Sequence, residues 1–270
     1  MDEFEIKEWY LWSCQSFPGL FNMSADHYLA RQLGKKLDRP LLRFFTWKPF
    51  CISLGFHQKT DDLDLTRCQK DGLDVVRRPT GGRAILHARE LTYSVVYPYG
   101  SLDVTSLYRL IHLPFVNALQ QLGVPAEFKP SQTDFRKFYR SDQQAVCFAT
   151  SAKYEVEIEG RKLIGSAQRV YENSVLQHGS LLLGDDHEKL VDYLDLPGEK
   201  KNLMREYIRQ HTATVWQFVP GVTAESLAEK VREQFTRNFN IRFSPFEKQA
   251  ILNEEYSTTE FRVTRQVRSP

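Results

Sequence analysis

The chain has 270 residues, of which 41% are hydrophobic and 26% are charged. This length permits one large domain with a proper hydrophobic core, and the composition excludes disordered, collagen-like and low-complexity proteins. The 36 basic and 34 acidic side chains leave a net charge of +2, spread too evenly to predict nucleic acid as a partner. The sequence contains no apolar run of 18 residues and its first residues are acidic, so we expect neither a membrane-spanning helix nor a signal peptide.

Apolar periodicity predicts an alternation of strands and short helices in the first part of the chain. Residues 8–14 are expected to form a strand, and a helix is expected to run to about residue 37 with Ser24 as its N-cap. Strands are expected over residues 41–47 and 51–55, on either side of the turn at Lys48 and Pro49. A short helix over 65–70 and strands over 74–77, 84–86 and 91–97 follow.

The second part of the chain continues in the same way. Asp103 is expected to cap a helix to about residue 122, which Pro114 should kink or delay. Strands are expected from 153–158 through residue 183, followed by a short helix over 186–194. A last helix is expected behind Thr223, ending at Asn240. Because the strands do not alternate strictly with helices, the pattern predicts a mixed α+β fold and not a doubly wound one.

The four cysteines, Cys14, Cys51, Cys68 and Cys147, lie far apart and form no C-x-x-C motif. This spacing predicts neither a zinc site nor a disulfide framework, and we expect a cytoplasmic protein with reduced thiols. Cys147 stands among apolar neighbours, which is typical of an inert core residue. The alternative is a nucleophile, for which a nearby cation would have to favour the thiolate.

A turn with paired glycines follows the strand that ends at residue 77. Its residues of interest are Arg77, Arg78, Thr80, Gly81, Gly82, Arg83 and His87. Paired glycines let the backbone approach a ligand closely and present free N–H groups. The segment matches neither a phosphate-binding loop nor a dinucleotide-binding motif, and by itself it is compatible with an ordinary turn.

Two further segments combine glycine with a polar side chain. In the first, Lys162 precedes Gly165, Ser166 and Ala167, so its ammonium could be held over the sheet, although an exposed strand lysine is the common alternative. In the second, His178 and Gly179 precede an apolar strand, which is compatible with a site wall or with a buried, hydrogen-bonded histidine.

Taken together and in this order, the segments 77–93, 146–148, 159–168 and 177–183 resemble the lipoate/biotin protein ligase superfamily. The resemblance is greatest to octanoyltransferases related to lipoate–protein ligase A. It implies the mixed α/β ligase catalytic domain, similar in outline to class II aminoacyl-tRNA synthetases. We assign this domain to residues 1–245 and a helical C-terminal extension to residues 246–270. One departure is Ala88, which follows His87 where the family commonly has an aspartate.

The resemblance also implies a reaction and its residues. Cys147 would accept an octanoyl group from octanoyl-acyl carrier protein and pass it to a lysine of a lipoyl domain or of the glycine-cleavage H protein. Lys162 would lie near the acyl carbonyl, and the two glycine-containing segments and the His178–Gly179 pair would wall the acyl tunnel. No metal or cofactor is implied. Apart from the resemblance, the basic residues Arg136, Lys137 and Arg140 could steer an acidic carrier protein, and a solvated loop is the alternative.

Three alternatives stay open at this stage. An ATP-dependent lipoate–protein ligase would form an acyl-adenylate and leave Cys147 idle. An octanoyl amidotransferase would move the group between carrier proteins by the same thioester chemistry. A catalytically silent lipoyl-binding protein is weakly indicated by Ala88 alone.

Overall fold

The computed structural model describes residues 3–33, 35–130, 154–247 and 261–263. Their main element is an eight-stranded mixed sheet with the strand order β11-β1-β2-β6-β10-β9-β8-β7. The strands are β1 (Glu8–Phe17), β2 (Leu41–Trp47), β6 (Glu90–Pro98), β7 (Glu127–Pro130), β8 (Tyr154–Ile158), β9 (Arg161–Val170), β10 (Ser174–Leu182) and β11 (Arg242–Pro245). β1 runs parallel to β2 and β11, and every other neighbouring pair is antiparallel.

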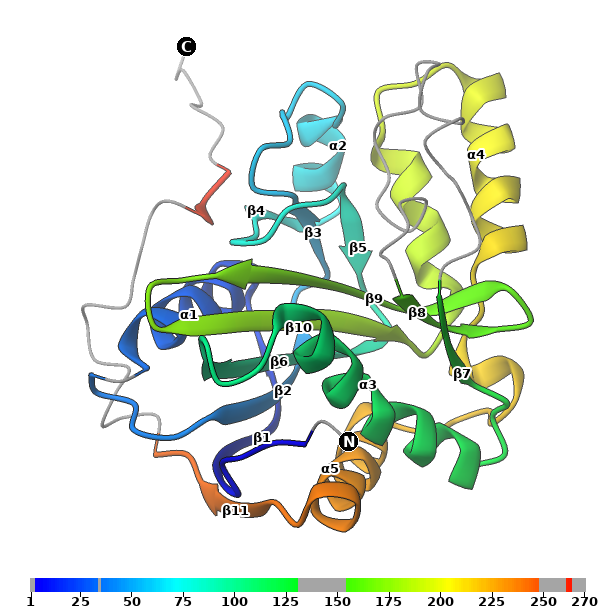
Figure 1. Ribbon diagram of the computed structural model, residues 1–270. Coiled ribbons are helices and arrows are strands. Elements are labelled where there is room, and N and C mark those ends of the chain that lie inside the picture. The colour runs from blue at the N-terminus through cyan, green and yellow to red at the C-terminus, as the bar shows by residue number, and fades with distance from the viewer. Residues whose placement is uncertain (1–2, 34, 131–153, 248–260, 264–270) are drawn as a thin grey trace.

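A second, three-stranded sheet stands against the large one (Figure 1). It consists of β3 (Cys51–Leu54), β4 (Asp74–Arg77) and β5 (Ile85–His87), with β3 in the centre. The remaining elements are the α-helices α1 (Gly19–Gln32), α2 (Leu65–Lys70), α3 (Val104–Gln121), α4 (Gly198–His211) and α5 (Ala224–Phe239), and the 3₁₀ helices η3 (Asp185–Tyr193) and η4 (Val215–Gln217).

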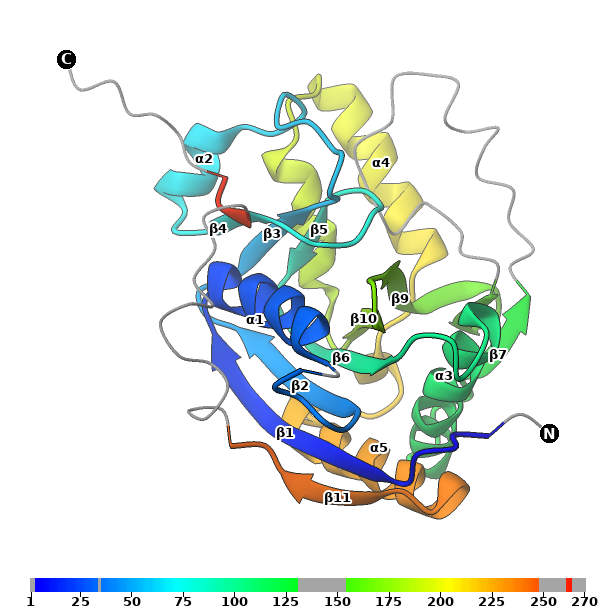
Figure 2. The same ribbon diagram turned by 60° about the vertical axis from the view of Figure 1, so that its left-hand side comes forward.

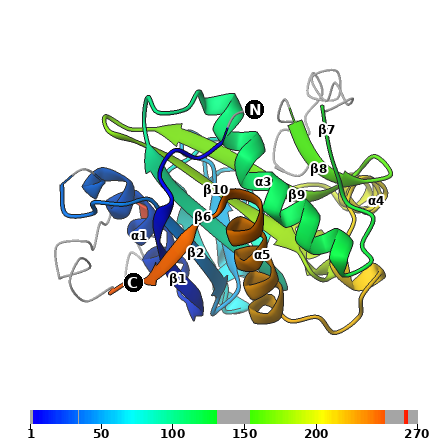
Figure 3. The ribbon, with the colours of Figure 1, turned by 60° about the horizontal axis from the view of Figure 1, so that its bottom comes forward.

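Helices cover both faces of the large sheet. α3 and α5 lie together across one face, as Figure 3 shows, and enclose the largest apolar cluster with side chains such as Phe115 and Phe235. α1 packs on the opposite face around Leu29 (Figure 2). η3 and α4 pack against the small sheet through a separate cluster. The mixed α/β fold class predicted from the sequence is therefore confirmed.

Most of the expected elements are present, and two of the expected caps have the predicted chemistry. The Asp103 carboxylate accepts hydrogen bonds from the backbone N–H groups of Thr105 and Ser106, both at 3.0 Å, at the start of α3. Asn240 ends α5 in the left-handed conformation, with φ 54°. A short polar side chain tolerates this conformation better than most residues do.

Other local expectations were wrong. Ser24 does not cap α1, which begins at Gly19 behind Pro18, and Ser24 is buried within the helix. Within the helix, the buried polar groups of Asn22 and Asp26 have partners across the core, which local capping rules do not register. Pro114 does not delay the helix that contains it, because α3 begins at Val104 and continues to Gln121.

The structure also adds elements that the periodicity did not predict, namely β7, β11 and α4. The segment expected to be a short helix over 186–194 forms the 3₁₀ helix η3. Most of the expected C-terminal helical extension, residues 248–260 and 264–270, lies outside the described residues. No helix within the described ranges is long and apolar enough to cross a membrane.

A buried ion pair joins α1 to the large sheet. Arg43 of β2 and Asp26 of α1 are both fully buried, with 2.7 Å between the Arg43 Nη1 atom and the Asp26 Oδ1 atom. The guanidinium lies between the rings of Trp12 and Phe45, at 4.4 and 4.0 Å from their centroids. Burial opposes ionisation of Asp26, but Arg43 and the hydrogen bonds from His178 and Ser94 hold the pKa of its carboxyl below the usual value.

We expect Asp26→Ala to lower the free energy of unfolding by about 3–5 kcal/mol, because it leaves the Arg43 guanidinium buried without its counter-charge. Asp38→Ala is the matched control, since it removes an exposed pair with Arg39 and should change stability by at most about 1 kcal/mol. Urea unfolding at pH 7 measures both variants. Equal effects in the two variants would contradict the structural importance of the buried pair.

Candidate functional site

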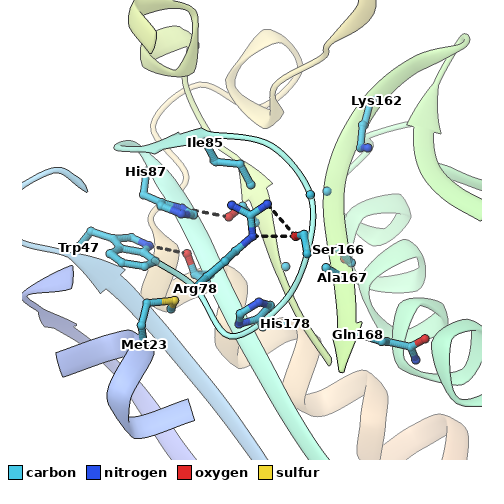
Figure 4. Close-up of a pocket in the computed structure, with 16 residues that line it drawn as sticks. Met23, Trp47, Arg78, Ile85, His87, Lys162, Ser166, Ala167, Gln168 and His178 are labelled. Atoms are coloured by element: carbon cyan, nitrogen blue, oxygen red, sulfur yellow. Dashed lines mark hydrogen bonds between the residues drawn. The ribbon is translucent and has the colours of Figure 1, made fainter. Parts of the chain in front are cut away.

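A cavity of about 320 Å³ lies between the large sheet and the turn that joins β4 to β5 (Figure 4). It is lined by Met23, Trp47, Arg78, Gly81, Gly82, Ile85, His87, Thr92, Lys162, Gly165, Ser166, Ala167, Gln168, His178, Gly179 and Ser180. Ten of the residues singled out from the sequence are thus brought together here: Arg78, Gly81, Gly82, His87, Lys162, Gly165, Ser166, Ala167, His178 and Gly179. Arg77, Thr80 and Arg83 are not among the lining residues.

The floor of the cavity is open because small residues occupy the strands beneath it. Gly165 and Ala167 alternate along β9, so the face that they share carries almost no side-chain volume. His178 and Ser180 alternate on the neighbouring strand β10, where His178 pairs with Ala167 in the antiparallel register. A narrow, mostly apolar groove above the sheet follows from this pattern.

The turn above the floor is held by arginines. Arg78 donates hydrogen bonds to the backbone carbonyls of Ser53, Gly81 and Arg83 at 2.8–3.1 Å. Arg77 donates to three further carbonyls, those of Gly55, Phe56 and Gln58. Both guanidinium groups, which the sequence suggested as ligand contacts, therefore fix the shape of the backbone around the cavity.

Two glycines allow this turn to approach the small sheet. A side-chain carbon on Gly55 would overlap the carbonyl oxygen of Gly82, so only glycine fits at position 55. Gly82 itself has a φ of 102°, which favours glycine. Gly55 and Gly82 are therefore needed for the close packing of the turn, whereas Gly81 has open space around it.

A chain of hydrogen bonds connects the turn to the buried ion pair. The imidazole of His178 lies between Asp26, 3.1 Å from its Nδ1 atom, and Thr80, 2.6 Å from its Nε2 atom. Burial lowers the pKa of His178, so the ring is neutral and donates from Nδ1 to the Asp26 carboxylate. Thr80 then donates its hydroxyl hydrogen to Nε2, and His178 is a wall residue in a fixed tautomer.

A second polar cluster forms the wall around His87. Its ring contacts Ser53 through Nε2 at 2.7 Å and Glu90 through Nδ1 at 2.8 Å. Trp47 stacks on the same ring with 4.0 Å between centroids and donates its indole N–H to Thr92 at 2.7 Å. Burial opposes ionisation of Glu90, but His87 and the neighbouring hydroxyls hold the pKa of its carboxyl below the usual value.

Lys162 lies at one rim of the cavity (Figure 4). Its Nζ atom is 2.7 Å from Oε1 of Glu155, and both side chains are more than nine-tenths buried. The position of Lys162 depends on a β-bulge, because the pairing of β8 with β9 shifts by one residue between Val156–Ile164 and Glu157–Lys162. A shift of one residue exchanges the two faces of a strand, which turns Lys162 away from the core face that Ile164 occupies.

The hydroxyl of Ser166 takes part in a separate network on the α3 side of the sheet. It lies 2.8 Å from the Tyr93 hydroxyl and 2.9 Å from Nε2 of His112. The His112 Nδ1 atom bonds to the carbonyl of Tyr108 at 2.7 Å. Burial, and to a lesser extent the charge of Lys162, lowers the pKa of His112 to about 4. Ser166 thus borders the cavity while its hydroxyl is directed toward α3.

Cys147 lies outside the described residues. The other three cysteines do not line the cavity. Burial raises the pKa of Cys14 to about 12 and that of Cys68 to about 11, and it also raises the pKa of Cys51. These three thiols are therefore poor nucleophiles at neutral pH.

Residues 18–236 match the lipoyl protein ligase A/B catalytic domain, and the chain belongs to this family. Among curated relatives it is 37% identical to the octanoyltransferase LipM of Geobacillus kaustophilus, over 85% of each chain. It is 34% identical to the octanoyltransferase LipM of Bacillus subtilis, over 84% of each chain. The family predicted from the ordered motifs is therefore confirmed.

Solved structures show the same fold. A lipoate-protein ligase A bound with ATP matches with a TM-score of 0.71 and 23% identity, covering 94% of this chain and 98% of the other. The bipartite lipoate protein ligase of Thermoplasma acidophilum matches with a TM-score of 0.72 and 23% identity, covering 94% and 96%.

Sequence reasoning missed several residues of the site. Met23, Trp47, Ile85, Thr92, Gln168 and Ser180 line the cavity. Glu90 and Glu155 hold the side chains of His87 and Lys162. Glu90 carried a local signal, because it opens a strand of mostly apolar residues, and charged residues are seldom fully buried without a partner. Met23 and Trp47 carried none, since both read as ordinary core residues.

Gly179→Ala tests the packing of the two strands beneath the cavity. The new carbon would overlap the Ser166 hydroxyl and lie 2.8 Å from both the Gly165 carbonyl oxygen and Tyr93. We expect a loss of about 1–3 kcal/mol in the free energy of unfolding. Gly81→Ala is the matched control, because no atom lies within 4 Å of its added carbon. Chemical denaturation should leave Gly81→Ala close to wild type, and equal losses in both variants would refute the close approach.

The buried His112 predicts a loss of stability in acid. A pKa lowered in the folded state means that the folded protein favours the neutral ring, so this contribution is complete above the unfolded value of 6.5 and is lost as the pH falls toward about 4. The shift corresponds to roughly 3 kcal/mol. Urea unfolding of wild type between pH 7.5 and 4 should show this slope, and His112→Gln should have a flatter one. An unchanged slope in the variant would contradict the assignment.

Proposed function

We propose that the chain is an octanoyltransferase of lipoate assembly, which transfers an octanoyl group from octanoyl-acyl carrier protein to a lysine of a lipoyl domain or of the glycine-cleavage H protein. The observation that carries the proposal is the preformed, mostly apolar cavity that is bordered by the buried Lys162 ammonium. The names of the curated relatives, octanoyltransferase LipM, support the transferred group.

The cavity suits a linear acyl chain. Met23, Trp47, Ile85 and Ala167 provide apolar surface, and Gly165 leaves the floor clear. Burying an alkyl chain against such walls is favourable by about 0.8 kcal/mol for each methylene group. The polar side chains His87 and His178 are engaged with Glu90 and Asp26, so they shape the walls.

The first half-reaction forms an acyl-enzyme. The Cys147 thiolate attacks the thioester carbon of the donor, a new carbon–sulfur bond forms, and the donor's carbon–sulfur bond breaks as its thiol leaves with the proton that Lys162 gives up. The Lys162 ammonium, oriented by Glu155 at 2.7 Å, supplies the positive charge that favours the cysteine thiolate.

The second half-reaction transfers the acyl group to nitrogen. The amine of the acceptor lysine attacks the Cys147 thioester, an amide bond forms, and the cysteine leaves as a thiolate. The proton lost by the amine passes to a base, which we assign to Lys162 after it has given up its own proton. A thioester is already activated, so no step requires ATP.

One feature of the described residues supports this route over adenylate formation, and a second concerns which thiol would carry the acyl group. The guanidinium groups of Arg77 and Arg78, which could have bound phosphate, donate to backbone carbonyls of the protein itself. The raised pKa values of Cys14, Cys51 and Cys68 and their positions outside the cavity leave Cys147 as the candidate thiol.

The acyl-enzyme predicts a mass increase that requires no ATP. We expect the purified chain, mixed with octanoyl-acyl carrier protein, to gain one octanoyl group that hydroxylamine removes. Intact-protein mass spectrometry measures the adduct. Cys147→Ser should form no hydroxylamine-sensitive adduct, whereas the matched control Cys68→Ser, which changes a buried thiol outside the cavity, should behave like wild type.

The same assay separates the alternatives. Transfer to a lipoyl domain that appears only with ATP and free octanoate or lipoate would establish a ligase and overturn the proposal. Acylation only from octanoylated H protein, and not from acyl carrier protein, would establish an amidotransferase between carrier proteins. An adduct that survives in Cys147→Ser would remove Cys147 from the mechanism.

A further inference from the structure

One aromatic side chain of the C-terminal segment is buried close to the cavity, although this residue is far in the sequence from the residues that line the cavity. Phe261 has no exposed surface and belongs to a small apolar cluster with Met23, Phe45, Trp47, Cys51 and Val76. Of the other described residues of this segment, Arg262 is exposed and Val263 is half-buried. Phe261 therefore acts as the anchor of the segment.

The position of Phe261 is defined by contacts on two sides. Its neighbour Arg262 forms an antiparallel bridge with Val76, which places the segment along the outer edge of β4 (Figure 2). On the other side the Phe261 ring meets the ring of His27 on α1 edge-on, with 5.0 Å between centroids. The ring is thus inserted between the small sheet and α1.

Two members of the Phe261 cluster also line the cavity. Met23 and Trp47 contribute to both, whereas Phe261 does not line the cavity itself. Phe261 therefore belongs to the buried apolar cluster that packs this wall. Trp47 is held on its other side by the His87 ring and by the Thr92 hydroxyl, but Met23 is an unbranched, flexible side chain whose conformation depends on what packs behind it.

The wall formed by Met23 and Trp47 lies across the cavity from Lys162 (Figure 4). If the acyl carbonyl is placed beside Lys162, as the proposed function requires, the end of the acyl chain points toward Met23 and Trp47. We propose that Phe261 is a positioning residue that closes the distal end of the acyl cavity through Met23 and Trp47 and so limits the length of the acyl chain. This inference rests on the proposed function for the identity of the ligand.

Phe261→Ala tests the inference, with Phe246→Ala as the matched control. Phe246 is another aromatic residue late in the chain, but it packs on Tyr10 and Trp12, neither of which lines the cavity. Rates of acyl-enzyme formation are compared for octanoyl- and dodecanoyl-acyl carrier protein. We expect Phe261→Ala to raise the ratio of kcat/KM for dodecanoyl over octanoyl by about tenfold or more, and Phe246→Ala to leave this ratio unchanged.

A general loss of stability would lower both rates together, so only the ratio reports on cavity length. Phe261→Leu, a smaller truncation, should shift the ratio in the same direction by less, and it serves if Phe261→Ala does not fold. An unchanged ratio in a folded variant would overturn the inference. If wild type proves to be an ATP-dependent ligase, the same ratio is measured with free octanoate and dodecanoate, so the two proposals fail independently.

Discussion

The ion pair between Arg43 and Asp26 is the interaction on which the site depends. A fully buried guanidinium is tolerated only with a counter-charge and good packing, which Asp26 and the rings of Trp12 and Phe45 supply. The second oxygen of Asp26 then orients His178, which in turn receives the Thr80 hydroxyl. One buried charge pair thus ties α1 and β2 of the scaffold to β10 and to the turn above the cavity.

The charged and polar side chains around the cavity are held by partners within the protein. The arginines of the turn and the histidines of the walls have partners within the protein, which makes them rigid. Lys162 is also paired, but with Glu155 at the rim, where the bulge in β9 places it. Under the proposed function, this rigid, mostly apolar cavity would hold the acyl tail while the carbonyl reacts beside the Lys162 ammonium.

Residues close together in the sequence were interpreted well, and their distant partners were not. The glycine pair at 81–82, the lysine at 162 and the histidine at 178 were all selected from local patterns, and all line the cavity. Arg77 and Arg78 were selected too, because they lie next to the glycine pair. Most of the hydrogen bonds by which they hold the turn, however, go to backbone carbonyls some twenty residues earlier in the chain. Ser24 failed as a cap for the same reason, since local capping rules do not include contacts across the core.

The sequence by itself determined the fold class, most strands, the caps at Asp103 and Asn240, and the family, because periodicity, caps and ordered motifs are local features of the chain. Tertiary structure alone decided which groups meet: Glu155 with Lys162, Asp26 with His178, and Phe261 with His27. It also decided where α1 begins. Through a one-residue bulge it decided the face of β9 to which Lys162 points. Such contacts depend on sheet register and on burial, which arise when segments distant in sequence pack together.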